Sequence, residues 1–295
     1  MPVLEYLTIK SDEGSSVGHI LAARLHLSPS LIRRLKTREG GILLNGAAAR
    51  VNARVAAGDT VSADVSDFEG GNLASPIPFP LDIVFEDEWL AVINKPAGMA
   101  VHGGEGSVTL ANALAALWGA ETAFHAVSRL DKGTSGLMIA AKCGYIHDRL
   151  RRMLHGEDFR REYLAVCAGN IESDFGTVEL PISASAVAGT RRAIDPRGLK
   201  SVTEYRVLTR FDGVTLLRVR PLTGRTHQIR LHFSAIGHPL IGDGVYGEKS
   251  PLIERPALHS ERILLRHPVS NEVLEFCAPM PGDMEKIFTN RSLLL

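Results

Sequence analysis

Cysteine and unbalanced charge are both scarce in this sequence. Its 295 residues include three cysteines, Cys143, Cys167 and Cys277, whose spacing is not that of metal ligands. Such a small, odd set is typical of a reducing cytosol, so we expect a cytoplasmic protein. Lys plus Arg and Asp plus Glu number 33 each, which leaves no overall field to attract nucleic acid. Any RNA site must therefore be a local basic surface.

Long hydrophobic runs are also missing. No apolar stretch approaches the length that spans a membrane, and Asp12 and Glu13 precede any signal-like segment, so we expect no membrane partner. The hydrophobic content of 45% is ordinary for a globular protein. The length allows roughly two domains.

The first 66 residues predict a small α+β domain. Residues 3–9 alternate apolar and polar, and helical spacing begins at Val17. Ser28 can cap a second helix that has Pro29 at its first position. A strand that ends at Asn45-Gly46 then gives a strong hairpin signal.

The second of these predicted helices is basic. It carries Arg33, Arg34 and Lys36 on its outward face, which can lie along a phosphate backbone. A solvated helix face is the alternative, and for charges alone it is the commoner case. The order of helix, Ser-Pro, basic helix, strand and Asn-Gly turn resembles the small RNA-binding domain named after ribosomal protein S-four. That resemblance implies that these three side chains contact RNA.

Residues 67–80 are rich in Gly, Pro and polar residues, which indicates a linker. We therefore place a second domain at 81–295. Its central stretch has an apolar run, Leu137–Ala141, that predicts a buried strand, with a tight turn of residues 132–136 in front. Asp131 then lies on a loop at a sheet edge, where a scaffold can present a reactive group. An Asp that only closes its own turn is the alternative.

A second stretch, residues 223–232, follows a predicted strand. Thr226 can cap a helix that stops at Gly237. The core side of this helix would carry Ile229, Phe233 and Ile236. From Arg218 to Arg230 there are four arginines and no acid, beside a helix N-terminus that is itself partly positive. We expect the strongest anion-attracting site of the chain here.

The central stretch, Arg129-Leu130-Asp131 followed by Thr134-Ser135-Gly136, resembles the signature of the pseudouridine synthases of the RluA type. Further blocks agree in the same order, and they are Asn94–Gly98, Arg160–Val166, Gly224–Arg230, and the segment from Asp243 to Pro281. The sequence departs at Ser128, where that family usually has His. That His is not the family's catalytic group, so the difference concerns substrate detail.

The resemblance implies an α+β catalytic domain with a mixed, largely antiparallel sheet and a central active-site cleft. The implied activity is the isomerisation of specific uridines to pseudouridine in structured RNA, with 23S ribosomal RNA as the first expectation and transfer RNA as the second. No metal and no organic or other small-molecule cofactor is expected.

The resemblance also implies roles for single residues. Asp131 would initiate cleavage of the glycosidic bond, either as nucleophile or by removing a sugar proton. Arg230 would hold that carboxylate, for which a planar guanidinium is suited in bidentate geometry. Tyr163 would stack on the flipped uracil and take the final proton. Arg129 would fill the space that the base vacates, and Leu231 would pack near the base.

Two further basic residues are RNA-binding candidates. Lys95 lies on a Pro-fixed loop from which it could reach a phosphate or a base oxygen, although such a Lys is often merely exposed. Arg225 could contact RNA or serve a structural salt bridge.

Two other functions stay open at this point. Asp131-Lys132-Gly133-Thr134 loosely resembles the aspartyl-phosphate loop of phosphotransferases, although the usual context of that loop is missing. The chain could also be an RNA-binding ribosome-assembly factor without catalysis.

Overall fold

The computed structural model describes residues 2–67, 74–103, 106–119, 123–154, 156–187, 189 and 191–289. The helices are α1 (Val17–Ala23), α2 (Pro29–Leu35), α3 (Leu110–Trp118), α4 (Gly144–Met153), α5 (Gln228–Ala235) and α6 (Gly282–Thr289). The strands are β1 (Val3–Leu7), β2 (Ile42–Leu44), β3 (Ala47–Ala48), β4 (Thr60–Asp64), β5 (Asp82–Glu86), β6 (Leu90–Lys95), β7 (His125–Ala126), β8 (Ser135–Ala141), β9 (Phe159–Ala168), β10 (Phe175–Glu179), β11 (Val202–Phe211), β12 (Val214–Pro221), β13 (Leu258–Arg266) and β14 (Val273–Cys277). None of the described helices has the length and apolar character needed to cross a membrane.

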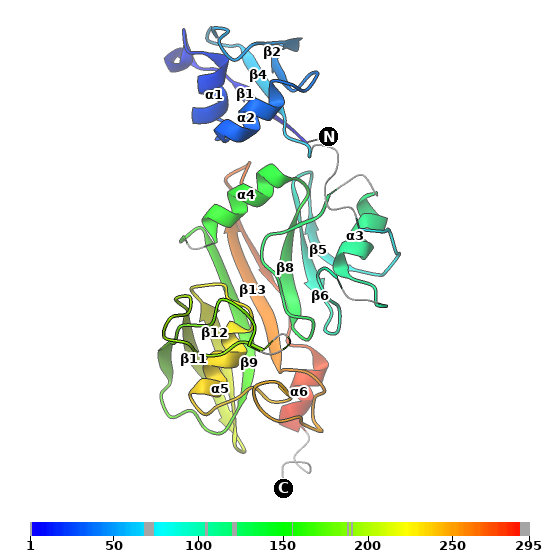
Figure 1. The fold of residues 1–295 in the computed structure, drawn as a ribbon, viewed down its shortest axis with the longest axis vertical. Coiled ribbons are helices and arrows are strands. Elements are labelled where there is room, and N and C mark those ends of the chain that lie inside the picture. The colour runs from blue at the N-terminus through cyan, green and yellow to red at the C-terminus, as the bar shows by residue number, and fades with distance from the viewer. Residues whose placement is uncertain are drawn as a thin grey trace.

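The N-terminal unit contains a four-stranded sheet in the order β1-β4-β2-β3, with α1 and α2 packed on it (Figure 1). The backbone N–H of Leu31 donates to the Ser28 hydroxyl at 3.2 Å, and Pro29 opens α2, so the predicted cap is confirmed. Asn45 and Gly46 have φ values of 52° and 78°, as a two-residue hairpin turn requires. Local signals thus account for most of this unit.

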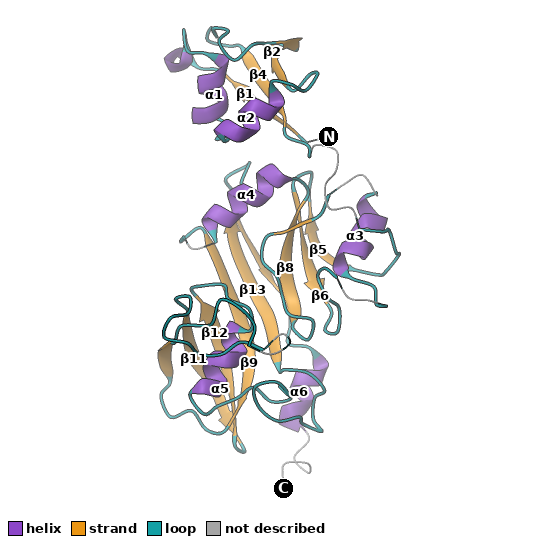
Figure 2. Cartoon of the chain, in the orientation of Figure 1, coloured by secondary structure: helices purple, strands orange, loops and turns teal. Residues whose placement is uncertain are grey.

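The larger body is built on a ten-stranded sheet in the order β10-β11-β12-β9-β13-β8-β6-β5, with β14 beside β13 and β7 beside β8 (Figure 2). Among the described strands only β8 and β13 pair in parallel, so the sheet is mixed and largely antiparallel. Helices cover both faces. The α+β class predicted from the sequence is therefore confirmed.

Strand β8 lies inside this sheet and is buried along its whole length. Leu137 and Ile139 pack on the side of α4, whereas Met138 and Ala140 pack on the side of α3. A strand covered on both faces has no polar positions, which explains its uninterrupted apolar run. The loop that carries Asp131 leads directly into this strand.

Helix α4 lies between the small unit and the large sheet (Figure 1). The Tyr145 hydroxyl donates to the Leu25 carbonyl at 2.7 Å. The Asp67 carboxylate accepts a hydrogen bond from the Gly144 backbone N–H at 2.8 Å, at the N-terminus of α4, and pairs with His125 at 2.7 Å. Burial opposes ionisation of Asp67, but these contacts outweigh it and hold its pKa below the ordinary value. The two units are therefore joined by polar contacts as well as by a shared apolar cluster.

The close approach of β8 to β13 requires glycine at position 136. Gly136 has φ +105°, and a Cβ there would lie 2.3 Å from the Ser260 carbonyl oxygen. We expect Gly136→Ala to lower the free energy of unfolding by about 3 kcal/mol or more, measured by urea denaturation of the whole chain.

The matched control is Gly282→Ala, since a Cβ at Gly282 meets nothing within 4 Å. That control should stay within about 1 kcal/mol of the unmodified protein. A Gly136→Ala variant as stable as the control would contradict the steric argument.

Candidate active site

A cleft of about 880 Å³ opens beside the loop that precedes β8. Its walls come from residues 126–134, the start of β9, residues 221–230 and the end of α4. Asp131 lines the cleft, and its side chain is 25% exposed. A ligand in the cleft can therefore reach this carboxylate from solvent.

The backbone of the Asp131 loop is held from both sides. Inside the loop, the Thr134 backbone N–H donates to the Asp131 carbonyl oxygen at 3.0 Å. From outside, the Gly98 N–H donates to the Lys132 carbonyl at 2.8 Å, and Arg255 Nη1 donates to the Gly133 carbonyl at 3.2 Å. Asp131 closes its turn with its main chain, so its carboxylate is left for the cleft.

Arg230, on α5, connects Asp131 to a second carboxylate. Its Nη1 donates to Asp131 Oδ2 at 3.1 Å. Its Nε and Nη2 donate to the two oxygens of Asp243 at 2.7 and 2.8 Å, and Asp243 is fully buried. The bidentate pair that the sequence suggested for Asp131 is therefore wrong. Arg230 donates two hydrogen bonds to Asp243 and one to Asp131.

Arg230 and Asp243 stabilise each other's charged form. Burial would lower the pKa of Arg230, but the hydrogen bonds and charges of Asp243 and Asp131 outweigh it and raise the pKa above its ordinary value. Burial likewise opposes ionisation of Asp243, yet Arg230 holds the pKa of that carboxyl below its ordinary range. Arg230 is thus a fixed cation at neutral pH.

Tyr163 lies in the middle of β9 and lines the same cleft. The residue is 5% exposed and packs in a cluster with Leu130 and Ile229. Within the described part of the chain its hydroxyl has no hydrogen-bond partner. The phenol is therefore available to a molecule that enters the cleft.

The rim of the cleft is basic. Arg129 and Arg225 are exposed, and together with Arg151 at the end of α4 and the more buried Arg161 they line it. Arg225 Nε also donates to the Lys200 carbonyl, at 3.2 Å. The cleft therefore offers one carboxylate on its wall and several guanidinium groups around it.

Comparisons with known proteins identify this arrangement. Residues 89–235 match the family model of the RNA pseudouridylate synthases. A Bacillus subtilis protein, named as the uncharacterized RNA pseudouridine synthase YhcT, is 34% identical over 96% of both chains. The chain belongs to the RNA pseudouridine synthases.

Other relatives agree with this family. The ribosomal large subunit pseudouridine synthase D of Nitrosomonas europaea is 38% identical over 82% of this chain and 74% of its own length. The solved structure of human RNA pseudouridylate synthase domain containing 1 has a TM-score of 0.56, with 28% identity over 68% of this chain and 83% of that chain. The chain is therefore an enzyme of an RNA-modifying, isomerising family, as its central motif suggested.

Lys95 occupies a different place in this pseudouridine synthase than the sequence suggested. It is fully buried, and its ammonium donates to the carbonyls of Pro96 and Met99 at 2.8 and 2.9 Å. The side chain therefore closes its own turn instead of reaching outward, and we correct the expectation that it contacts RNA. Its turn contains Gly98, so Lys95 acts on the Asp131 loop through the backbone.

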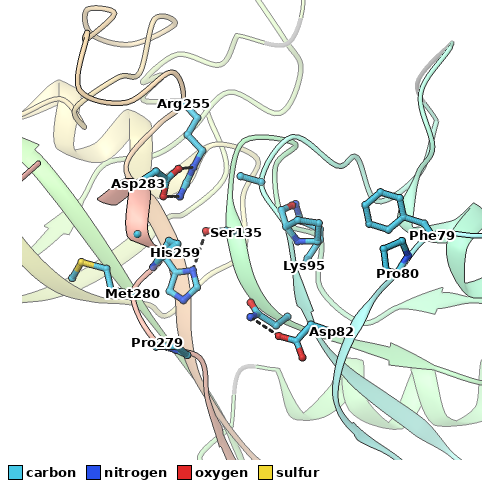
Figure 3. A pocket seen from close by; sticks show the side chains of 15 residues that line it. Phe79, Pro80, Asp82, Lys95, Ser135, Arg255, His259, Pro279, Met280 and Asp283 are labelled. Carbon is cyan, nitrogen blue, oxygen red and sulfur yellow. Dashed lines mark hydrogen bonds and ion pairs between the residues drawn. The ribbon is translucent and has the colours of Figure 1, made fainter. Parts of the chain in front are cut away.

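Figure 3 shows a second cavity, of about 670 Å³, whose lining includes Lys95 and a pair formed by Ser135 and His259. The Ser135 hydroxyl and His259 Nδ1 are 2.9 Å apart. Arg255 binds Asp283 of α6 through two bonds of 2.7 and 2.8 Å. These polar side chains pair with one another, and Arg255 also binds the Gly133 carbonyl. They therefore stabilise the backbone of the Asp131 loop and are not available to a ligand.

The remaining RNA-binding candidates lie away from the cleft. Leu231 is buried against Ile182 and Tyr246 and does not line the cleft, because neighbouring positions on a helix point in different directions. The prediction that it packs near the base is not supported by this position. Arg33 and Arg34 of α2, and Lys36 at its C-cap, are exposed on the small unit.

Helix α5 begins differently from the prediction. Thr226 does not cap it, because His227 is the N-cap residue, in the left-handed region with φ 59°. The helix ends before Gly237, as predicted, but Ile236 is 38% exposed instead of buried. The turn places His227 Nε2 3.7 Å from Asp131 Oδ2.

Sequence reasoning thus missed three residues of the site. They are His227, Asp243 and Tyr246, whose hydroxyl lies 2.9 Å from His227 Nδ1. The segment from Asp243 to Pro281 agrees with the family pattern, but the sequence alone suggests no role for the side chain of Asp243. Nothing local in that block indicates that Asp243 meets Arg230, because the contact depends on how the loop folds back onto α5.

The buried charge of Lys95 predicts a pH dependence of stability. Burial lowers its pKa from 10.5 to about 8, although the charge of Asp131 partly opposes this shift. Between these two pH values the unfolded chain keeps a proton that the folded chain has released, so the wild-type free energy of unfolding rises with pH.

We expect the difference in unfolding free energy between wild type and Lys95→Met to change by about 2 kcal/mol in favour of the wild type between pH 7.5 and 9.5. Urea denaturation at both pH values measures it, and the other titrating groups cancel in the comparison. Parallel pH profiles for the two proteins would show that Lys95 keeps its ordinary pKa.

Proposed function

We propose that this enzyme converts uridine to pseudouridine in structured RNA, ribosomal RNA first, and that Asp131 initiates the reaction. One observation carries the assignment of Asp131. Its Oδ2 is held by Arg230, whereas its Oδ1 has no hydrogen-bond or ion-pair partner among the described residues. A carboxylate fixed through one oxygen can present the other to a substrate.

The first chemical step breaks the bond between uracil N1 and the ribose. Asp131 acts either by attacking as a nucleophile or by taking a proton from the sugar, and both routes require an ionised carboxylate. Arg230 maintains a positive charge beside it. After rotation, the base is rejoined to the sugar through carbon, and Tyr163 is our candidate for removal of the remaining proton.

Access to the target base requires that it leave its stack. This costs a few kcal/mol, which stacking on an aromatic ring and basic contacts help to offset. Tyr163 provides the ring, and Arg129 is suited to occupy the vacated space because it is exposed at the rim. Arg225 and Arg151 are suited to phosphates on either side.

Ribosomal RNA is favoured because several relatives that cover most of the chain are named as ribosomal large subunit pseudouridine synthases. The Escherichia coli K12 enzyme of that name, for example, is 38% identical over 83% of this chain. Transfer RNA is the second candidate. The small unit at residues 1–66 would add a second RNA contact through α2, and residues 81–295 would form the catalytic domain. A cytoplasmic location belongs to this proposal, and it agrees with the three unpaired cysteines.

Asp131→Asn tests the central role. Asn keeps the size of the side chain but is neither a nucleophile nor a base, so turnover should fall by at least about a thousand-fold while RNA affinity stays within about two-fold. Pseudouridine mapping of RNA from cells that lack this protein, complemented with either chain, measures the effect and identifies the target.

Asp212→Asn is the matched control, because Asp212 is exposed at the hairpin between β11 and β12. It should restore the modification fully. Restoration by Asp131→Asn as well would remove Asp131 from the chemistry.

The contribution of α2 is tested by its charges. Neutralising Arg33 and Lys36 to Gln should weaken RNA binding and reduce the slope of log K against log salt by about 1.5, if both side chains meet phosphates. The control pair is Lys249 and Lys286 changed to Gln, since both are exposed in other parts of the chain. Equal salt slopes for the two double variants would exclude RNA contact by these α2 residues.

A further inference from the structure

His227 stands between Asp131 and a tyrosine hydroxyl. Its Nε2 lies 3.7 Å from Asp131 Oδ2, and its Nδ1 lies 2.9 Å from the Tyr246 hydroxyl oxygen. The imidazole is 9% exposed. Its backbone has φ 59°, a conformation that few residues other than glycine adopt, so the fold holds this side chain at a cost.

The backbone N–H of Arg192 determines one of the hydrogen bonds of the Tyr246 hydroxyl. The backbone N–H of Arg192 can only donate, and it lies 2.7 Å from the Tyr246 hydroxyl oxygen. The hydroxyl therefore accepts from Arg192, and its own hydrogen is free to point at His227 Nδ1. In a neutral imidazole the remaining hydrogen is then on Nε2, directed at Asp131.

The opposite tautomer is disfavoured by the carboxylate. With the hydrogen on Nδ1, the lone pair of Nε2 would face the negative charge of Asp131. The doubly protonated ring is disfavoured as well. Burial lowers the pKa of His227, and the positive charges of Arg230 and Arg192 act in the same direction, which together outweigh the carboxylates of Asp131 and Asp243.

We propose that His227 is a positioning residue of this enzyme: Tyr246 fixes its neutral tautomer, and its Nε2–H hydrogen-bonds Asp131 Oδ2 when RNA occupies the cleft. The separation of 3.7 Å is longer than a hydrogen bond, and the proposal requires that it shorten when RNA binds. Arg230 and His227 then hold the same oxygen, and Oδ1 is the atom that reacts. This inference rests on the proposed role of Asp131.

The tautomer of His227 tests the proposal without any measurement of activity. Two-bond ¹H–¹⁵N spectra of the full-length protein labelled at histidine nitrogens distinguish the two neutral forms and the imidazolium. His227→Asn identifies the signal by its loss. We expect the Nε2–H tautomer at pH 7.5, and a larger share of the Nδ1–H tautomer in Tyr246→Phe, which lacks the donor to Nδ1. A wild-type ring with its hydrogen on Nδ1, or with both nitrogens protonated, overturns the proposal.

Two replacements of His227 separate a hydrogen-bond donor from a backbone requirement. Gln places an amide N–H near the position of Nε2, whereas Asn is too short to reach Asp131 but tolerates the left-handed conformation better. If donation matters, His227→Gln retains most of the turnover and His227→Asn loses about 30-fold. If only the backbone matters, Asn is the better replacement, which would overturn the proposal.

Tyr246→Phe completes the test, because it leaves His227 in place and removes one oxygen atom. Turnover on a pseudouridylation substrate should fall by about ten-fold while RNA affinity stays unchanged. Unchanged turnover together with an unchanged tautomer would contradict the proposal that Tyr246 acts through His227. Absence of pseudouridine formation by the wild-type protein would instead contradict the proposed function, and the spectra would still report the state of His227.

Discussion

Arg230 is a cation buried between two carboxylates, and the geometry of the cleft depends on that arrangement. A buried guanidinium is tolerated only if its charge and its donors are matched. Asp243 takes Nε and Nη2, which fixes the plane of the group and leaves Nη1 directed at Asp131. Asp243 lies 13 residues after Arg230, and Asp131 lies 99 residues before it. These ion pairs therefore hold α5 and the two loops that carry Asp243 and Asp131 in fixed relative positions.

The same logic extends to the backbone around Asp131. A side chain can be aimed within a fraction of an ångström only if its main chain cannot shift. Here the loop accepts hydrogen bonds from Gly98 and from Arg255, and it enters a strand that is buried on both faces. The absence of a Cβ at Gly136 lets β8 approach Ser260 of β13 closely. Gly98, Arg255 and Ser260 support the loop without lining the cleft themselves.

The sequence predicted the parts of the structure that depend on neighbours in the chain. The cap at Ser28 and the buried strand from Leu137 both follow from such local patterns. The sequence did not predict the features that depend on contacts between distant segments of the chain. Lys95 was expected at the surface, yet its turn is covered by the rest of the fold and its own carbonyls satisfy the ammonium. Helix α5 begins after His227 instead of after Thr226. His227 adopts the left-handed conformation, and its Nδ1 lies 2.9 Å from the hydroxyl of Tyr246, a residue of a later loop.

The neutral net charge gave no sign of a nucleic-acid partner, and the distribution of ion pairs explains why. Many arginines on the strands are paired with acids, as Arg218 is with Glu261 and Arg266 with Asp158. Around the cleft this is not so: within the described residues, Arg129, Arg151 and Arg225 have no acidic partner. Fields of paired charges cancel at short range, whereas unpaired charges that line one cleft add. The chain can therefore be neutral as a whole and still attract a phosphate backbone to the cleft that Asp131 lines.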